Sequence, residues 1–465
     1  MRRPGFSVTA PQPGRRDARP TNAARSRTPP AIDWTSQMTD AQTATADAAP
    51  IKKMPRKAWL IIGLLMALLV LNYFDRQTLS ILKPIMKAEL AFDDEAYSLL
   101  TFAFMLPYIL MYVVSGRLID RFGTRASMTV FAIGWSVANI VSGLSHNFGH
   151  LVASRVLMGA AEPGAFPVVQ RAILNWVPIE RRALAISIAT PAGNIGAILA
   201  PPLIALLATG IGWRAAFVIP GVIGIIVAIL WWFADTRHTP PAQPMADAAP
   251  TLPEPVDDGD ASVRGLMRDK RFWSIIAVRM LSDPVWYFYL FWIPGYLQER
   301  VGLSLSELGL VGGLPFIAAV LMCMVLGRVV DRFTERGHDP IRVQLRIFAF
   351  TAALMPLGAI ITMTSSAALA IAIITIVVVV CQAWFVGYNV LLAGLFSARV
   401  NASAVGILGA VGASTSLILN LLAGSILEQF DYVALFVGLA VLHPLSAVIL
   451  IVVIGRSRRA ISARA

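Results

Sequence analysis

The sequence contains a regular succession of long apolar runs, and this feature constrains the fold most strongly. We place twelve such runs along the chain of 465 residues. Each fits the roughly 20 residues that an α-helix needs to cross the hydrocarbon core of a bilayer. They fall near residues 58–82, 97–118, 126–145, 150–175, 183–208, 214–234, 272–297, 305–329, 343–363, 367–392, 402–427 and 432–455. The pattern predicts an all-α polytopic membrane protein with twelve transmembrane helices.

Composition excludes several classes of protein. With 57% hydrophobic and 14% charged residues, the chain lacks the polar side chains to cover a soluble globular domain. The net charge of +12 is spread over short segments between the apolar runs, which argues against nucleic acid as a partner. Cys323 and Cys381 lie in apolar runs without metal-ligand spacing. Neither a phosphate-binding Gly-rich loop nor a zinc motif occurs, so we predict no ATP-driven pump, no enzyme and no cofactor.

The two halves of the chain share a loop signature. Gly116 begins Gly-Arg-Leu-Ile-Asp-Arg-Phe-Gly-Thr-Arg, and Gly327 begins Gly-Arg-Val-Val-Asp-Arg-Phe-Thr-Glu-Arg, 211 residues later. A duplicated six-helix unit with a polar linker is typical of transporters whose halves rock about a central site. We predict a disordered cytoplasmic tail, an N-terminal six-helix bundle, a cytoplasmic linker, a C-terminal six-helix bundle and a cytoplasmic tail over residues 1–55, 56–236, 237–270, 271–456 and 457–465.

Lys and Arg gather in alternate loops, and this bias sets the orientation of the helices. They are dense in the N-terminal tail, the loops after the second, fourth and eighth runs, the linker, and the C-terminus with Arg456, Arg458 and Arg459. With twelve spans all these segments lie on one side of the membrane. We therefore expect both termini in the cytoplasm.

The first apolar run carries adjacent opposite charges, Asp75 and Arg76. A charge at the centre of a spanning helix costs about 2.5–3.5 kcal/mol on insertion scales, so it usually has a function. Adjacent helical residues point about 100° apart and do not pair with each other, so each needs a partner elsewhere. Arg76 suits a carboxylate ligand because its planar fork donates two parallel hydrogen bonds. The alternative interpretation is that the two charges mark the water-facing end of the helix.

A second charged set lies in the fourth run. Arg155 and Glu162 are seven residues apart, about two helical turns, and so share one face. With Arg155 within reach, Glu162 would be a proton switch whose affinity depends on the partner that Arg155 holds. The alternative is a structural ion pair between helices. We expect protonation of Asp75 and Glu162 to keep the site near neutral when an anionic substrate is bound.

Polar and aromatic side chains in other runs are further candidates for substrate binding. Aromatic faces stack on sugar rings, and amides bind hydroxyl groups. The residues concerned are Tyr287, Trp384, Gln382, Asn389 and Asn194. Helix packing is the alternative role for each of them. Pro284, Pro294 and the pair Pro163–Gly164 are expected to break their helices.

The repeated loops suggest a conformational latch on the cytoplasmic side. An Asp there can pair with an Arg, or with a helix N-terminus, when that side is closed. The candidates are Gly116, Asp120, Arg121 and Arg125 in the first half and Asp331 and Arg332 in the second. A plain contribution of the arginines to membrane orientation is the alternative.

These motifs resemble known families. The loop from Gly116 to Arg125 is similar to the signature loop of the major facilitator superfamily (MFS). Asn72–Arg76, with Arg155, Glu162 and Trp213–Phe217, resembles the anion:cation symporter family. Within that family, Ser282–Pro294 and Cys381–Trp384 are similar to bacterial hexuronate transporters. The chain departs from the pattern at Ala165, Gly394 and Ser397, where the family has an amide, an Asp and a Pro.

The resemblance implies the MFS fold and proton-coupled uptake of a sugar acid, here a hexuronate, across a bacterial inner membrane. The residues that match Asp75 and Glu162 bind protons, and those that match Arg76 and Arg155 handle the substrate carboxylate. The residues that match Tyr73 and Tyr108 line the sugar site. The expected partners are a small anionic substrate, protons and lipid, with the protein as a monomer. The alternatives are another organic anion, such as an aldonate, an aldarate or a non-sugar carboxylate, and an anion sensor that does not transport.

Overall fold

The computed structural model describes residues 54–178, 181–236 and 262–462, and every regular element in these ranges is helical. The first elements are α2 (Arg56–Ile81), α3 (Lys83–Leu90), α4 (Asp94–Gly143), α5 (Phe148–Ala161), η1 (Glu162–Gly164), α6 (Ala165–Trp176), α7 (Arg182–Ala189), α8 (Ala192–Gly210) and α9 (Ala215–Ala234). The later ones are α10 (Val263–Leu266), α11 (Lys270–Glu299), α12 (Leu305–Val311), α13 (Leu314–Glu335), α14 (Pro340–Ala352), η4 (Met355–Met363), α15 (Ala367–Leu395), α16 (Ala398–Ala440) and α17 (Leu442–Ser462).

Helical segments occupy all twelve predicted ranges, although their boundaries differ in places. Two long helices contain a residue with positive φ, Gly123 (φ 76°) in α4 and Asp431 (φ 63°) in α16, at the points where the sequence predicts a loop between two spans. Eight stretches in the described part of the chain are long and apolar enough to cross a membrane, two of which contain these breaks. The count of twelve spans stays a prediction.

The three predicted proline breaks have different outcomes. Pro163 and Gly164 lie in the 3-10 turn η1, which separates α5 from α6 as expected. Pro284 and Pro294, by contrast, lie inside the continuous helix α11, so the expected breaks there are wrong. Neighbouring helices can compensate for the hydrogen bonds that proline removes from a membrane helix.

The predicted tails and linker lie partly outside the described residues. This applies to 1–53 of the first tail, to 237–261 of the linker and to 463–465 of the last tail. The described remainder of the linker forms α10, and α17 continues to Ser462, past the predicted start of the C-terminal tail. The side chains of Arg456, Arg458 and Arg459 also lie outside the described set.

Polar residues between the apolar runs begin the helices. The carboxylate of Asp93 accepts a hydrogen bond from the amide of Ala96 (2.7 Å) at the start of α4. Ser304 and Glu307 form a reciprocal capping box at the start of α12. Such side chains satisfy amides that have no partner inside the helix. Polar caps thus mark where α4 and α12 become helical.

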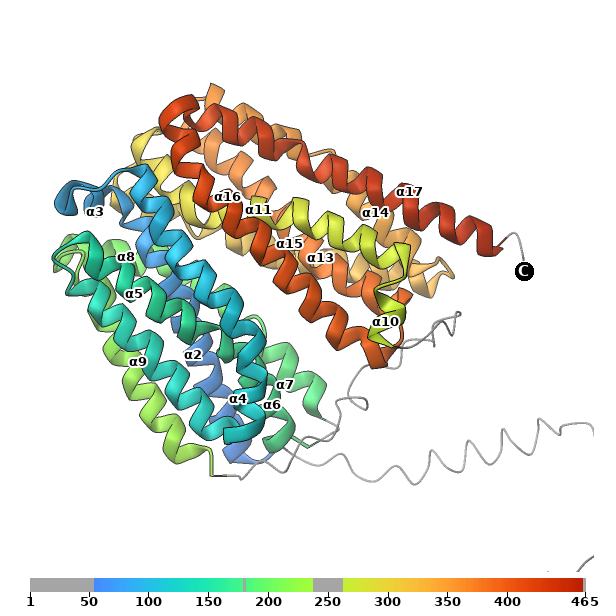
Figure 1. Ribbon diagram of the computed structural model, residues 1–465, viewed down its shortest axis with the longest axis horizontal. Coiled ribbons are helices and arrows are strands. Elements are labelled where there is room, and N and C mark those ends of the chain that lie inside the picture. The colour runs from blue at the N-terminus through green and yellow to red at the C-terminus, as the bar shows by residue number, and fades with distance from the viewer. Residues whose placement is uncertain (1–53, 179–180, 237–261, 463–465) are drawn as a thin grey trace, which may run out of the picture. The chain divides into compact units, whose positions relative to one another are not determined.

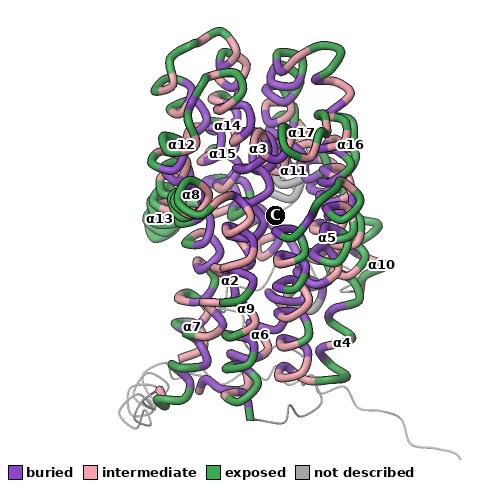
Figure 2. Tube along the Cα trace, turned by 90° about the vertical axis from the view of Figure 1, so that its left-hand side faces the viewer, coloured by how far each residue is buried: buried purple, intermediate pink, exposed green. Residues whose placement is uncertain are grey.

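Small residues let the helices approach closely. A Cβ atom on Gly159 of α5 would lie 2.0 Å from the carbonyl oxygen of Phe104 in α4. Close contact through small residues is the usual way in which membrane helices associate, because lipid supplies no hydrophobic driving force between them. Figure 2 shows that buried and exposed residues alternate along each helix, as expected for helices that bury one face against their neighbours.

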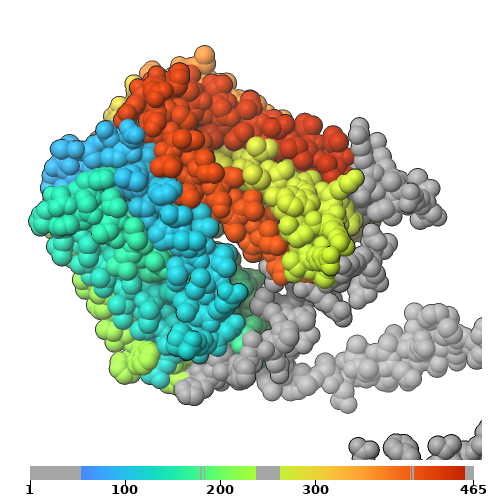
Figure 3. Space-filling view, in the orientation of Figure 1, coloured from blue at the N-terminus to red at the C-terminus, as the bar shows by residue number. Residues whose placement is uncertain are grey.

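The helices from α2 to α9 lie together, as do those from α11 to α17 (Figure 1). The two sets meet where α4 packs on α16, α8 on α12 and α2 on α11. One of these contacts depends on glycines: Gly309 in α12 and Gly312 just after it face Ala205 and Pro201 of α8, and we call this contact the glycine seam. At the separate contact of α4 with α16, the amide of Gly424 donates a hydrogen bond to the Ser98 hydroxyl (2.7 Å). Figure 3 shows the two sets in contact on one side of the view and separated by a gap on the other.

A buried lysine also joins the two sets. The ammonium of Lys83, which is 0% exposed, lies 2.8 Å from Asp94 Oδ1 and 3.3 Å from Glu299 Oε2. It also lies 4.7 Å from the centre of the Trp292 ring. Asp94 begins α4 and Glu299 ends α11, so this cation contacts one carboxylate from each set. The half-buried Lys87 lies 2.8 Å from the same Asp94 oxygen and 4.0 Å from Glu299. We call Lys83, Asp94 and Glu299 the lysine clamp.

Candidate functional site

Arg76 of α2 and Glu162 of η1 form a buried ion pair. The guanidinium donates from Nε (3.1 Å) and Nη2 (2.6 Å) to one carboxylate oxygen, Glu162 Oε2. Arg76 is 7% exposed and Glu162 is 1% exposed. Glu162 Oε1 has no hydrogen-bond partner among the described residues. Two charges out of water are tolerated when they neutralise each other. Arg76 thus finds a partner elsewhere in the fold, as expected, and this partner is Glu162. One carboxylate oxygen of Glu162 remains without a hydrogen bond among the described residues.

Aromatic rings surround this arginine. The guanidinium carbon of Arg76 lies 5.2 Å from the ring centre of Tyr73, 5.5 Å from that of Phe104 and 5.1 Å from that of Tyr108. Tyr287 of α11 lies close enough to Arg76 and Tyr108 to interact with both electrostatically. Aromatic faces attract a cation at these distances. Three of the tyrosines predicted to bind substrate therefore gather around one guanidinium, from both halves of the chain.

Asp75 points toward a different group. Its Oδ1 accepts a hydrogen bond from Asn139 Nδ2 of α4 (2.8 Å), and the same nitrogen donates to the carbonyl of Phe217 in α9 (2.9 Å). Asp75 is 0% exposed, and its Oδ2 has no hydrogen-bond partner within the described ranges. Sequence reasoning did not select Asn139. The available signal was an amide inside an apolar run, in the same half as a buried carboxylate.

Arg155 does not form the ion pair with Glu162 that was the alternative interpretation of their spacing. Its Nη2 donates to the hydroxyl of Ser142 (2.5 Å). Its Nε has no hydrogen-bond partner in the part of the chain that the structure describes. The Glu162 carboxylate instead pairs through Oε2 with Arg76 of a different helix. Arg155 remains close enough to Glu162 and Asp75 for electrostatic interaction.

A small cavity joins the two arginines. Its free space of about 10 Å³ is room for roughly one water molecule. The lining residues are Arg76, Leu79, Leu100, Thr101, Phe104, Arg155 and Phe291. Asp75, Arg76, Arg155 and Glu162 therefore form one buried group at the junction of α2, α4, α5 and α11. The alternative interpretation, in which Asp75 and Arg76 mark an exposed helix end, does not fit their burial.

The remaining predicted binding residues are not drawn together. Trp384 lies in the core of the second set, where its Nε1 donates to Thr351 (2.9 Å) and its ring packs 4.5 Å from that of Phe348. These contacts match the alternative role of helix packing, and its role in binding stays a prediction. Asn194 and Gln382 are half-buried, and Asn389 is exposed and donates to the carbonyl of its own helix neighbour Phe385.

The predicted latch residues are exposed or half-buried and do not pair with each other. Arg125 donates to the carbonyl of Trp232 in α9 (2.7 Å), within its own half. Exposed positions are Gly116, Asp120, Arg121, Asp331 and Arg332, and among the described residues no side-chain hydrogen bond or ion pair joins them to one another. In contrast, the lysine clamp and the glycine seam connect the two halves at the other ends of the same helices. The latch stays a prediction for a state in which the exposed ends close.

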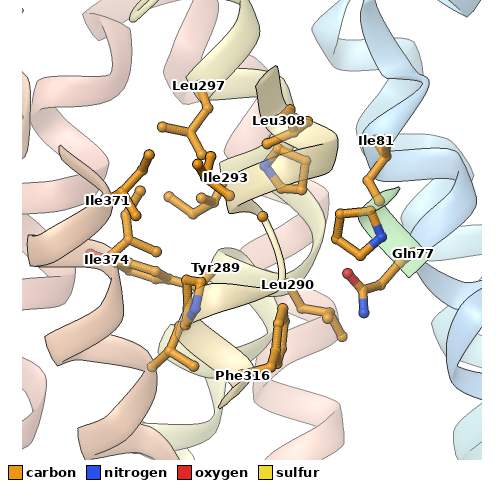
Figure 4. A pocket seen from close by; sticks show the side chains of 16 residues that line it. Gln77, Ile81, Tyr289, Leu290, Ile293, Leu297, Leu308, Phe316, Ile371 and Ile374 are labelled. Carbon is orange, nitrogen blue, oxygen red and sulfur yellow. The ribbon is translucent and has the colours of Figure 1, made fainter. Parts of the chain in front are cut away.

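A second, larger cavity of about 40 Å³ lies between α2, α8, α11, α12, α13 and α15 (Figure 4). Its lining is almost wholly aliphatic and aromatic, with Gln77 as a polar exception. Burying a charged ligand there would leave its charge without a partner. This cavity therefore does not suit an anion. Among the described residues, no group of three His, Cys, Asp or Glu side chains is placed to hold a metal ion.

Outside the membrane-spanning segments, Glu89 of α3 binds the segment before α9. It accepts hydrogen bonds from Trp213 Nε1 (2.6 Å) and Arg214 Nη1 (2.5 Å). These hydrogen bonds lower the pKa of the Glu89 carboxyl below its ordinary value. The contact holds the Trp213–Phe217 motif in place rather than forming part of the buried group.

Comparisons with known proteins agree with this architecture. The family model of the Major Facilitator Superfamily matches residues 65–388. The "Hexuronate transporter" of Escherichia coli (strain K12) is 26% identical over 408 residues, which cover 86% of this chain and 94% of that protein. The "Probable L-galactonate transporter" of the same strain is 29% identical over 326 residues, which cover 67% of this chain and 71% of that protein.

A solved structure is similar in fold. The crystal structure of a D-xylose-proton symporter superposes with a TM-score of 0.66 at 15% sequence identity, covering 84% of this chain and 96% of that one. At this identity the likeness supports the fold alone. The named relatives are transporters of organic anions rather than enzymes.

Proposed function

Because the chain belongs to the Major Facilitator Superfamily, we propose that it is a secondary active transporter that carries a sugar acid, specifically a hexuronate, into the cytoplasm together with protons. We place it in a bacterial inner membrane as a monomer in contact with lipid, with both termini in the cytoplasm. It needs no cofactor besides the coupling proton.

The observation that carries the proposal is the buried Arg76–Glu162 pair inside a cage of tyrosines. A substrate carboxylate has the same chemistry as the Glu162 side chain, so the two compete for one guanidinium. A proton on Glu162 removes its charge and releases Arg76 for the substrate. The tyrosine hydroxyl groups are then available to the hydroxyl groups of the sugar.

Charge balance links substrate to proton. The buried group holds two carboxylates and two guanidinium groups and is neutral when all four are ionised. An anion that enters this poorly hydrated group adds a negative charge, and a proton on Asp75 or Glu162 compensates for it. Release of the proton on the cytoplasmic side restores the Arg76–Glu162 pair and expels the anion. Alternating access by the two halves separates the two events in space.

Uptake into proteoliposomes tests the proposal. Vesicles with an alkaline interior should accumulate labelled glucuronate, and vesicles without a pH gradient should only equilibrate it. In Asp75→Asn we expect accumulation to be lost while exchange of internal for external glucuronate persists, because the substrate site remains. An Arg76→Lys variant that retains full uptake would refute the carboxylate role of Arg76. Binding of glucuronate without any accumulation by the unaltered protein would identify a sensor instead.

A further inference from the structure

A second buried ion pair lies in the other half of the chain. Arg279 and Asp283 stand one turn apart in α11, and Arg279 Nη2 lies 2.7 Å from Asp283 Oδ2. They are 7% and 9% exposed. Charges inside a membrane-spanning helix are rare and usually serve a binding or transport function. The Arg76–Glu162 mechanism does not use this pair.

The pair faces the first half of the chain. A Cβ atom on Gly412 of α16 would lie 1.9 Å from Asp283 Oδ2, so the carboxylate packs directly on bare backbone. One turn earlier on the same face, a Cβ atom on Gly409 would lie 3.8 Å from the ring of Tyr112 in α4. Arg279 lies close enough to Tyr112 for electrostatic interaction. The pair therefore lies at the meeting point of α4, α11 and α16.

A row of tyrosines connects the two ion pairs. Tyr112 stacks on Tyr108, with ring centres 6.3 Å apart and planes at 24°. Tyr108 in turn covers Arg76. Tyr287 lies in electrostatic range of both Arg76 and Asp283. The row thus has an arginine–carboxylate pair at each end, one from each half.

The chemistry around Arg279 suits hydroxyl groups. Its guanidinium carbon lies 4.9 Å from the ring centre of Tyr388 and 5.4 Å from that of Phe385. Its Nε has no hydrogen-bond partner among the described residues, although the side chain is buried. A guanidinium can only donate hydrogen bonds and a carboxylate can only accept them, so together they bind both functions of a sugar hydroxyl. The predicted residue Asn389 lies one turn after Phe385 on the same face of α15.

We propose that the Arg279–Asp283 pair binds the hydroxylated end of the substrate, remote from the carboxylate that Arg76 binds, and selects against a second carboxylate at that end. This inference rests on the proposed function and specifies its substrate class. Asp283 accepts hydrogen bonds from hydroxyl groups and repels a carboxylate, whereas Arg279 donates to the hydroxyl oxygens. A polyhydroxylated monocarboxylate then fits both ends, and an aldarate fits only one.

The test measures competition in proteoliposomes between labelled glucuronate and two unlabelled anions. Glucarate is hydroxylated with a carboxylate at both ends, and sulfoacetate is short and has no hydroxyl group. In Asp283→Asn we expect the preference for glucuronate over glucarate to fall by about tenfold or more, because the repelling charge is gone and Arg279 is free to bind a carboxylate. Inhibition by sulfoacetate should be unchanged, since it does not reach the second pair.

Two further variants isolate the cause. Gly412→Ala displaces the Asp283 carboxylate without removing any charge, and we expect it to weaken glucuronate uptake more than inhibition by sulfoacetate. Arg300→Met breaks an exposed Arg–Asp pair at the end of the same helix and should leave all ratios unchanged.

The outcomes separate the two proposals. If the unaltered protein accumulates no labelled glucuronate, both proposals fall. If it accumulates glucuronate but the glucarate ratio in Asp283→Asn is unchanged, only the selectivity role is refuted. Equal loss of glucuronate transport and sulfoacetate inhibition in Asp283→Asn and Gly412→Ala would assign the pair to helix packing, which also overturns the inference.

Discussion

Replacement of Glu162 by glutamine removes the negative charge from the Arg76 pair while preserving the shape of the side chain. Two hydrogen bonds join the partners, both to Oε2 (3.1 and 2.6 Å). A hydrogen bond to a charged acceptor contributes about 1.5–3 kcal/mol and a neutral one about 0.5–1.5 kcal/mol. The variant therefore weakens the contact that a substrate must displace by about 2–3 kcal/mol. At a pH where Glu162 is ionised, glucuronate should bind about 30–150 times more tightly to the variant.

The pH dependence has a definite sign. Protonation of Glu162 releases Arg76, so the unaltered protein should bind glucuronate best at low pH and lose affinity as this carboxyl ionises. Glutamine does not titrate, so the contribution of position 162 to the pH dependence disappears in the variant. Binding to purified protein at pH 6 and pH 8 measures both effects. Accumulation driven by a pH gradient should be lost, while exchange persists.

Stability gives a second readout. Arg76 keeps no charged partner in Glu162→Gln, so the variant without substrate should unfold at a lower temperature. Saturating glucuronate should restore more stability to the variant than to the unaltered protein, because a tighter ligand stabilises more. Glu307→Gln, which changes an exposed capping carboxylate, is the matched control. Weaker binding by Glu162→Gln at pH 8, or undiminished accumulation, would refute the competition between Glu162 and substrate.

Three more predictions concern other parts of the chain. Lys83→Met removes the buried one of the two ammonium groups at the clamp carboxylates and leaves only the half-buried Lys87, which lies 2.8 Å from Asp94 and 4.0 Å from Glu299. The halves should therefore separate there more readily. We expect a membrane-impermeant thiol reagent to label a cysteine at Thr101 faster in this variant, in a background without the native cysteines. Gly159→Ala forces a methyl group to 2.0 Å from a backbone oxygen and should cost at least about 1–3 kcal/mol in thermal unfolding. Gly63→Ala, where nothing lies within 4 Å, should gain up to about 1 kcal/mol. Glu89→Gln should lower the free energy of unfolding by less than about 1 kcal/mol, because the hydrogen bonds of Glu89 are near the surface. In the unaltered protein, the stabilisation by the ionised Glu89 should be lost as pH falls through its lowered pKa, so the difference between the two proteins should shrink at low pH.

Each of these predictions has a contradicting result. Unchanged labelling in Lys83→Met would show that the lysine clamp does not hold the halves together. Equal unfolding temperatures for Gly159→Ala and Gly63→Ala would mean that the close approach of α4 and α5 does not constrain the fold. A stability effect of Glu89→Gln that grows as pH falls below the lowered pKa would contradict the sign of its linkage.

The apolar runs were enough to predict the helices and the class of fold. Hydrophobic length is a local property, so it can be read along the chain without knowing any contact. The burial of Asp75 and Arg76 followed from the same local argument. The turn at Pro163–Gly164 was also predictable, whereas α11 continues through Pro284 and Pro294 because its neighbours determine whether a helix tolerates proline.

Partner choice was not predictable from spacing. The seven-residue interval between Arg155 and Glu162 places them on one face, but Arg76 reaches the carboxylate from another helix. Trp384 is a residue type that can stack on a sugar ring. Its position in the core depends on how α14 and α15 pack, which the sequence alone does not show. The Arg279–Asp283 pair did carry a signal, since opposite charges one turn apart stand inside an apolar run.

The glycine seam between α8 and α12 has a consequence for the speed of transport. Gly309 and Gly312 present no side chain that must change rotamer before the helices part. The facing surfaces of α8 and α12 can therefore separate as rigid bodies. The slow event of each turnover is then expected to be the withdrawal of the buried Lys83 ammonium group from between Asp94 and Glu299, because these charges must be rehydrated before the two sets of helices separate.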